Sequence, residues 1–215
     1  MRFSVPIRTI VLQDDGSAEL GIGSGIVHDS VPMDEYEETV LKGRFAFGQA
    51  VEFDLLESLY GDPKTGIRNL QAHLDRLETS ASAFMFPFNR DDIERRLADR
   101  SMSIEGESKI RLTMNRAGIP TITTQLLVED STPKTIILWD MPVDSLQLRY
   151  AYKTTDREFY DRVCAEAAKD HGTYDVVFTN QKGEITEASR HNIFLRFGDT
   201  YATPPLSCGV LPGIE

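Results

Sequence analysis

Cysteine and histidine are scarce in this sequence, which limits the metal and disulfide sites it can build. Among 215 residues there are 2 cysteines and 4 histidines. Cys164 and Cys208 are too few for a disulfide scaffold or a four-cysteine metal site, and they indicate a reducing, cytoplasmic compartment. The four histidines lie far apart and no two are spaced i,i+4, so histidine ligation of a metal is not expected.

Long apolar runs and positive charge are also missing. No apolar stretch approaches the roughly 20 residues of a membrane-spanning helix, and the N-terminal residues lack the apolar core of a secretory signal. Acidic residues outnumber basic ones by 34 to 23, giving a net charge of −11. Such a chain repels phosphate backbones and anionic lipid, so nucleic acid and membrane are not expected partners. With 40% hydrophobic and 27% charged residues, wholesale disorder is excluded.

Two common catalytic signatures are absent as well. The sequence contains no G-x-S-x-G nucleophile elbow. Residues 21–25, GIGSG, lack the G-x-G-x-x-G spacing, so they are only a weak candidate for a dinucleotide-binding loop.

The hydrophobic pattern predicts an α/β or α+β fold. A hairpin is expected around residues 14–16, then a tight glycine-rich turn at 21–25 and a helix capped by Asp34. Residues 46–51 are interpreted as a linker, and apolar residues at three- and four-residue steps predict a helix over 70–86, ended by Pro87. Further helices are expected over 91–99 and 157–171, the latter ended by Gly172, and strands over 52–60, 109–114, 121–128, 135–139, 174–179 and 192–197, with turns at 61–66 and 181–184. The chain ends directly after a proline- and glycine-rich loop, which suggests a C-terminally truncated piece.

The first candidate site is the acidic pair Glu35 and Glu38, which shares a helix face with Lys42. Two carboxylates there could hold Mg²⁺, with the lysine placed for an anionic ligand. The alternative is a solvated helix face with an ordinary Glu–Lys pair, the commoner reason for such a pattern.

The second candidate is Lys153, which follows aromatic and small residues and precedes a predicted helix. Partial desolvation there would lower the pKa of the amine and favour imine chemistry. The alternative is a surface lysine at a helix start, the usual environment of this residue type.

The third candidate lies near the C-terminus. A carboxylate in the small-residue turn at 183–189 could face a cofactor, and the loop at 203–214 could present backbone N–H groups to a phosphate.

Four motifs in order resemble the fold-type IV pyridoxal-phosphate enzymes, which include branched-chain and D-amino-acid aminotransferases and aminodeoxychorismate lyases. They are HLDRL at 73–77, Lys153 with Arg157 four residues later, GEITEAS..NIF at 183–194 and TPPLS.GVLPGI at 203–214. The resemblance covers about residues 48–215. It implies two subdomains, a small one at 46–145 and an incomplete cofactor-binding one at 146–215.

The N-terminal residues resemble a different family. FSVPIRTIVL and GIGSGIVHDSVPMDEYEETVLKGR look like the C-terminal tail of a chorismate-binding enzyme, aminodeoxychorismate synthase component I, over residues 1–45. In that family the matching positions, Glu35 and Glu38, bind Mg²⁺. Arg8, Thr9 and residues 23–25 match positions that contact the chorismate carboxylates. Most of that domain is missing, so productive chorismate binding is not expected.

The fold-type IV resemblance assigns a role to each matching residue. Lys153 would form the Schiff base with pyridoxal phosphate and then carry protons. The others implied are Arg76 on the phosphate, Glu187 on the pyridine nitrogen, Leu211 against the ring, the Ile214 backbone N–H on the phosphate, and Arg111 or Arg116 on a substrate carboxylate. Glu215 replaces a phosphate-binding threonine, so only its backbone N–H would serve.

The two resemblances together imply a synthase–lyase fusion of folate biosynthesis. Its lyase part would convert 4-amino-4-deoxychorismate to 4-aminobenzoate and pyruvate, and family members are commonly homodimers. The alternatives are a class IV aminotransferase and a non-catalytic fragment.

Overall fold

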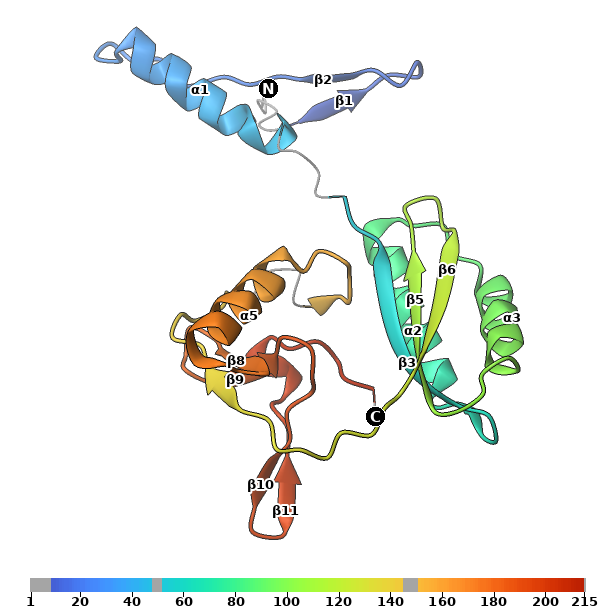
Figure 1. The fold of residues 1–215 in the computed structure, drawn as a ribbon. Coiled ribbons are helices and arrows are strands. Elements are labelled where there is room, and N and C mark those ends of the chain that lie inside the picture. Colours follow the sequence, from blue (N-terminus) through green and yellow to red (C-terminus); the bar gives the residue numbers. More distant parts are fainter. Residues whose placement is uncertain (1–8, 48–51, 145–150, 215) are drawn as a thin grey trace. The chain divides into compact units, whose positions relative to one another are not determined.

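The computed structural model describes residues 9–47, 52–144 and 151–214, and the chain divides into two compact units, Met1–Val51 and Glu52–Glu215 (Figure 1). Arg8, residues 48–51 of the expected linker, the expected subdomain boundary at 145–146 and Glu215 lie outside the described residues. Within the described ranges, no helix is both long enough and apolar enough to cross a membrane.

The first unit contains a hairpin and a helix. Strands β1 (Ile10–Leu12) and β2 (Ala18–Leu20) pair antiparallel, which confirms the predicted hairpin. Helix α1 (Pro32–Phe47) begins two residues before Asp34, so the prediction of Asp34 as its cap was wrong. Proline suits the first helical position because its missing N–H would have no partner there. The tight turn expected at 21–25 is also wrong, since this stretch carries no turn.

The second unit is a mixture of helices and sheets, which confirms the predicted α/β class. Its helices are α2 (Leu70–Phe84), α3 (Arg90–Ser101) and α5 (Glu158–His171), with a short 3₁₀ turn, η1 (Leu206–Cys208). One antiparallel sheet has the order β4-β3-β5-β6, formed by β3 (Leu55–Asp62), β4 (Gly66–Ile67), β5 (Ser108–Met114) and β6 (Pro120–Leu126). A second sheet has the order β7-β8-β9, formed by β7 (Ile136–Leu138), β8 (Asp175–Thr179) and β9 (Ile185–Ala188). A separate hairpin pairs β10 (Leu195–Phe197) with β11 (Thr200–Ala202).

The four-stranded sheet packs its alternate residues against α2 and α3. Leu59 lies opposite Ile110 in the β3–β5 register, and both are buried. They share a hydrophobic core with Leu74 and Leu77 of α2. Helix α2 ends earlier than expected, because Met85 takes a left-handed conformation two residues before Pro87.

The three-stranded sheet packs against α5. Strands β7 and β8 are parallel, and α5 lies between them in the sequence, as parallel pairing requires. Val163 of α5 and Phe178 of β8 belong to the same core cluster. Gly172 ends α5 at φ 64°, as predicted. Glu187 was expected in a turn, but the structure places it on β9, where pairing with β8 extends the chain.

The segment around Lys153 is anchored to the start of β3. The backbone N–H of Leu56 donates to the Lys153 carbonyl at 3.0 Å, and Leu55 forms an antiparallel bridge with Thr154. The backbone N–H of Thr155 donates to the Asp54 carbonyl at 2.9 Å. These bonds fix the backbone of Lys153 against the start of β3 in the four-stranded sheet. Helix α2 packs on a face of that sheet.

Candidate active site

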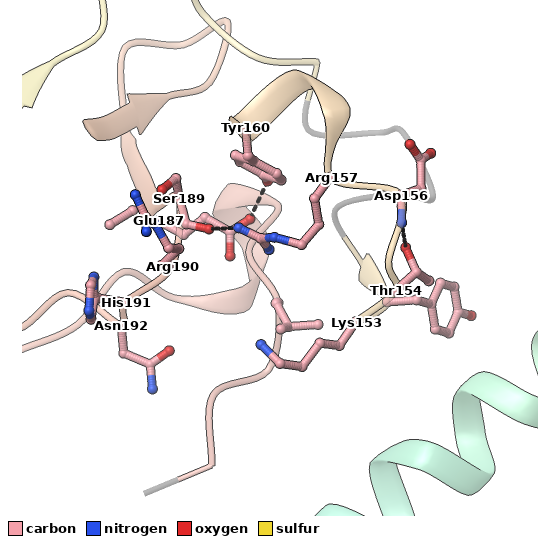
Figure 2. Close-up of a pocket in the computed structure, with 13 residues that line it drawn as sticks. Lys153, Thr154, Asp156, Arg157, Tyr160, Glu187, Ser189, Arg190, His191 and Asn192 are labelled. Carbon is pink, nitrogen blue, oxygen red and sulfur yellow. Dashed lines mark hydrogen bonds between the residues drawn. The ribbon is translucent and has the colours of Figure 1, made fainter. Parts of the chain in front are cut away.

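Lys153 extends its side chain into a pocket formed mainly by the start of α5, the end of β9 and the following loop (Figure 2). Glu187 and the residues after β9 lie on the opposite side of this pocket from the Lys153 backbone. The lining residues are Tyr152, Lys153, Thr154, Asp156, Arg157, Tyr160, Glu187, Ala188, Ser189, Arg190, His191, Asn192 and Leu211. The structure thus brings together Lys153, Glu187 and Leu211, which the sequence had singled out separately.

The environment of Lys153 favours its neutral amine. Burial lowers its pKa from 10.5 to about 8, with a further contribution from the positive charge of Arg76 and a smaller one from Arg157. Glu57 and Glu187 oppose this but do not outweigh it. About a tenth of this lysine is therefore uncharged at pH 7, far more than at its ordinary pKa, and the neutral amine is the state that attacks a carbonyl carbon.

Glu187 is held in place by two donors. The Tyr160 hydroxyl donates to its Oε1 at 2.6 Å, and the backbone N–H of Leu211 also donates to the carboxylate. Burial nevertheless raises the pKa of Glu187 above its usual value. A carboxylate fixed in this way presents its remaining lone pairs in a set direction.

Arg157 links α5 to the chain after β9. Its guanidinium donates to the backbone carbonyl of Ser189 and lies 5.3 Å from the ring centroid of Tyr160. The Tyr160 ring in turn packs edge-to-face on Phe178 at 5.2 Å. The groups that hold Glu187 are therefore built into the core of the second sheet.

Arg76 reaches the same region from α2. Its Nε and one terminal nitrogen donate to the two oxygens of Glu57 at 2.8 and 2.6 Å, and the other terminal nitrogen donates to the Pro212 carbonyl at 2.5 Å. These described bonds use three of five guanidinium N–H donors, leaving two for a further anion. Arg76 thereby connects α2 to the loop that follows Leu211.

Glu57 is a site residue that the sequence did not reveal. It is 1% exposed on β3, and His73 Nδ1 lies 2.8 Å from its Oε2, beside the two bonds from Arg76. Burial acts to raise the pKa of Glu57, but the hydrogen bonds from Arg76 and His73 outweigh it and lower the pKa. The carboxylate is therefore ionised at neutral pH and orients the guanidinium.

Replacing Glu57 with glutamine should destabilise the fold by about 3 kcal/mol, because it leaves a largely buried guanidinium without its charge partner. Urea unfolding followed by circular dichroism would measure the loss, with Glu105→Gln on the exposed surface as the control. Because the folded-state pKa is lowered, this stabilisation is present at neutral pH and should disappear as the pH falls below about 4. Equal stability of the two variants would contradict an energetic role for the Glu57–Arg76 pair.

Three other expected residues lie elsewhere. Ile214 ends the described loop and does not line the pocket. The preceding Gly213 lies close to the pocket residue Asn192, because a Cβ added at Gly213 would be only 2.9 Å from Asn192 Nδ2. Arg111 is exposed on β5, and Arg116 lies in the β5–β6 turn with its guanidinium 5.1 Å from the Phe86 ring. Neither arginine lines the pocket, so their contact with substrate stays a prediction.

In the first unit, the acidic pair Glu35 and Glu38 contacts neighbouring side chains. Lys42 pairs with Glu38 at 2.6 Å, and the Ser30 hydroxyl donates to Glu35 at 2.7 Å. Hydrogen bonds from Ser24 and Ser30 lower the pKa of Glu35. Across the described ranges no group of three or more His, Cys, Asp or Glu side chains is placed to hold a metal ion. Binding of Mg²⁺ by Glu35 and Glu38 stays a prediction.

The charge at the Lys153 pocket is opposite to that of the whole chain. The chain carries a net charge of −11, yet the pocket is lined by the cations Lys153, Arg157 and Arg190 and by the acids Asp156 and Glu187. Arg76 adds a positive charge close enough to lower the pKa of Lys153. This local excess of positive charge suits an anionic ligand that also meets an amine.

Two family models match the chain. Residues 55–215 match the class IV amino-transferase family, and residues 1–48 match the chorismate binding enzymes. No curated protein sequence matches significantly.

Solved structures extend the match to the fold. A provisionally assigned amino-acid aminotransferase from Mesorhizobium loti is 30% identical, with a TM-score of 0.67 over 75% of this chain and 79% of that one. A provisionally assigned 4-amino-4-deoxychorismate lyase from Legionella pneumophila is 22% identical, with a TM-score of 0.63 over 80% of this chain and 67% of that one. A provisionally assigned aminotransferase from Mycobacterium tuberculosis, in its pyridoxal-phosphate-bound form, is 20% identical with a TM-score of 0.64 over 95% and 74%.

Proposed function

Because the chain belongs to the class IV aminotransferase family, with the fold of its pyridoxal-phosphate enzymes, we propose that it binds pyridoxal phosphate at Lys153 and acts as an aminodeoxychorismate lyase. The proposed reaction converts 4-amino-4-deoxychorismate to 4-aminobenzoate and pyruvate. One observation carries the choice of substrate: a chorismate-binding segment at 1–48 directly precedes the class IV segment at 55–215 in one chain. Two consecutive reactions on a chorismate-derived ring would explain this pairing.

The pocket residues fit pyridoxal phosphate. An aldehyde needs a neutral amine, and the pKa of Lys153 is lowered to about 8. A pyridine nitrogen needs an acidic partner, which Glu187 supplies from the same pocket. A phosphate needs a cation, and Arg76 keeps two N–H donors beyond its described bonds. Leu211 offers an apolar side chain to the ring.

Pyridoxal phosphate would supply an aldehyde for imine exchange and an electron-withdrawing ring that stabilises negative charge on the neighbouring carbon. Lys153 would hold it at the aldehyde carbon, and the same lysine amine would take the proton from C4 of the substrate ring. Glu187 would hold a proton on the pyridine nitrogen, and the hydrogen bond from Tyr160 fixes the direction of the Glu187 carboxylate. Loss of the enolpyruvyl oxygen then makes the ring aromatic, which drives the reaction forward.

A second candidate is amino-group transfer, since the Mesorhizobium loti structure, at 30% identity, carries an amino-acid aminotransferase assignment. The two activities share Lys153 and Glu187 and differ in what leaves. A lyase releases pyruvate and 4-aminobenzoate, whereas an aminotransferase leaves the amino group on the cofactor.

The full chain, loaded with pyridoxal phosphate, should release 4-aminobenzoate and pyruvate in equal amounts from 4-amino-4-deoxychorismate. Fluorescence of 4-aminobenzoate and a coupled lactate dehydrogenase assay would measure the two products. Conversion of the cofactor to its amine form by D-alanine or L-leucine, without 4-aminobenzoate release, would replace this proposal by the aminotransferase one. Failure to retain the cofactor at saturation would favour a non-catalytic fragment.

A further inference from the structure

Asp175, the first residue of β8, is a buried carboxylate that the proposed chemistry does not use. It is 2% exposed. Its Oδ1 accepts hydrogen bonds from the Ser189 hydroxyl at 2.5 Å and from the Val176 backbone N–H at 2.7 Å, and the Cys164 sulfur lies 3.6 Å away. One oxygen is thus held by neutral donors. The other oxygen faces His191.

His191 provides the partner of that second oxygen. Its Nδ1 lies 2.5 Å from Asp175 Oδ2, and its ring stacks on Tyr174 with centroids 5.4 Å apart. Burial acts to raise the pKa of Asp175, but the hydrogen bonds from His191 and Ser189 outweigh it and leave the pKa well below its usual value. An ionised Asp175 can only accept, so His191 carries its Nδ1 proton in both charge states.

The opposite edge of the imidazole is available to a ligand. The His191 side chain is 50% exposed and lines the same pocket as Lys153 (Figure 2). With Nδ1 committed to Asp175, Nε2 remains for a ligand, and it donates when the ring is protonated. Arg190 lines the pocket beside it.

We propose that His191, oriented by Asp175, binds a carboxylate of the substrate at the mouth of the Lys153 pocket. The substrate class is a ring that carries both an amine and a carboxylate: the amine meets Lys153 while the carboxylate meets His191. The identity of that substrate rests on the proposed function, but binding of the carboxylate does not. Asp175 is a positioning residue that acts through His191.

Several other charged groups lie near His191 or line the pocket, and their effect on carboxylate binding must be distinguished from that of His191. Lys134 Nζ lies 5.4 Å from the centroid of the Tyr174 ring on which His191 stacks. The other charged residues that line the pocket are Lys153, Arg157, Arg190, Asp156 and Glu187.

Benzoate binding to the full chain with saturating pyridoxal phosphate tests the proposal, using the His191 ring signals in NMR and calorimetry. We expect benzoate to shift those signals and its Kd to rise about 10-fold in His191→Gln, as for loss of one charge-assisted hydrogen bond.

His171→Gln is the matched control, because this exposed histidine ends α5 and does not line the pocket. Asp175→Asn, with its fold checked by circular dichroism, should weaken benzoate binding as well. Unchanged benzoate affinity in His191→Gln, binding that leaves the His191 signals unmoved, or no binding at all would overturn the proposal. Because the readout is binding, these outcomes are separate from failure to release 4-aminobenzoate, which concerns the proposed lyase activity alone.

Discussion

Replacing Lys153 with alanine should reduce turnover by about 10⁴-fold or more, because one side chain supplies both the covalent link and the proton-carrying base. In the unaltered chain, borohydride should fix the cofactor permanently to Lys153, and peptide mass spectrometry would locate the adduct. In Lys153→Ala that adduct should be absent, although the phosphate still binds to Arg76. Capture of the cofactor should accelerate as the pH rises through about 8, since only the neutral amine attacks.

Lys169→Ala is the matched control, because Lys169 is an exposed lysine in the last turn of α5. It should behave like the unaltered chain in both the reduction and the turnover measurements. A reducible adduct that persists in Lys153→Ala would mean that another lysine holds the cofactor, and the assignment of Lys153 would be wrong.

The elements that sequence patterns predicted well are those whose stability is local or amphipathic. Leu74, Leu77 and Ala81 recur at helical spacing, and the structure buries all three on one side of α2. Gly172 ends α5 because a left-handed residue is needed there. In both cases the information lies within a few neighbouring residues.

The residues that escaped prediction depend on partners distant in the sequence. Glu57 follows Leu55 and Leu56 on a strand and looks like a solvent-facing carboxylate until α2 brings Arg76, 19 residues later, against it. Asp175 and His191 are likewise 16 residues apart and meet only because the chain returns along β9. Strand β9 itself has four residues, too few for a clear alternating pattern, and exists through its pairing with β8.

The two paired carboxylates make the pocket a fixed electrostatic environment. Glu57 orients Arg76, and Asp175 orients His191, while each carboxylate is itself almost fully buried. Groups held in this way need little reorganisation when an anion arrives, which strengthens their interaction with it. The sequence identified Lys153, Arg76 and Glu187, and the structure adds His191 together with the two acids, Glu57 and Asp175, that orient Arg76 and His191.

Replacing Glu187 with glutamine should leave cofactor binding intact but reduce turnover by about 100- to 1,000-fold. An amide has the shape of the carboxylate but no charge, so it cannot keep the pyridine nitrogen protonated, and the ring then accepts negative charge poorly. Steady-state release of 4-aminobenzoate measures the loss, and absorbance of the bound cofactor reports that binding persists. Glu166→Gln, on the exposed part of α5, is the control, and equal turnover in Glu187→Gln would refute the role.

The pH dependence of turnover can show that the charge of Glu187, and not its bulk, matters. Burial raises its pKa and the Tyr160 hydroxyl opposes that rise, so Tyr160→Phe should raise the pKa further. A larger fraction of Glu187 is then protonated at a given pH, and the acid limb of kcat/KM should move to higher pH, with activity recovering as the pH is raised. Tyr201→Phe, at an exposed tyrosine of β11, should leave that limb in place. If Tyr160→Phe lowers activity equally at every pH, Tyr160 acts through packing alone, and the hydrogen bond to Glu187 does not tune the ionisation of the acid.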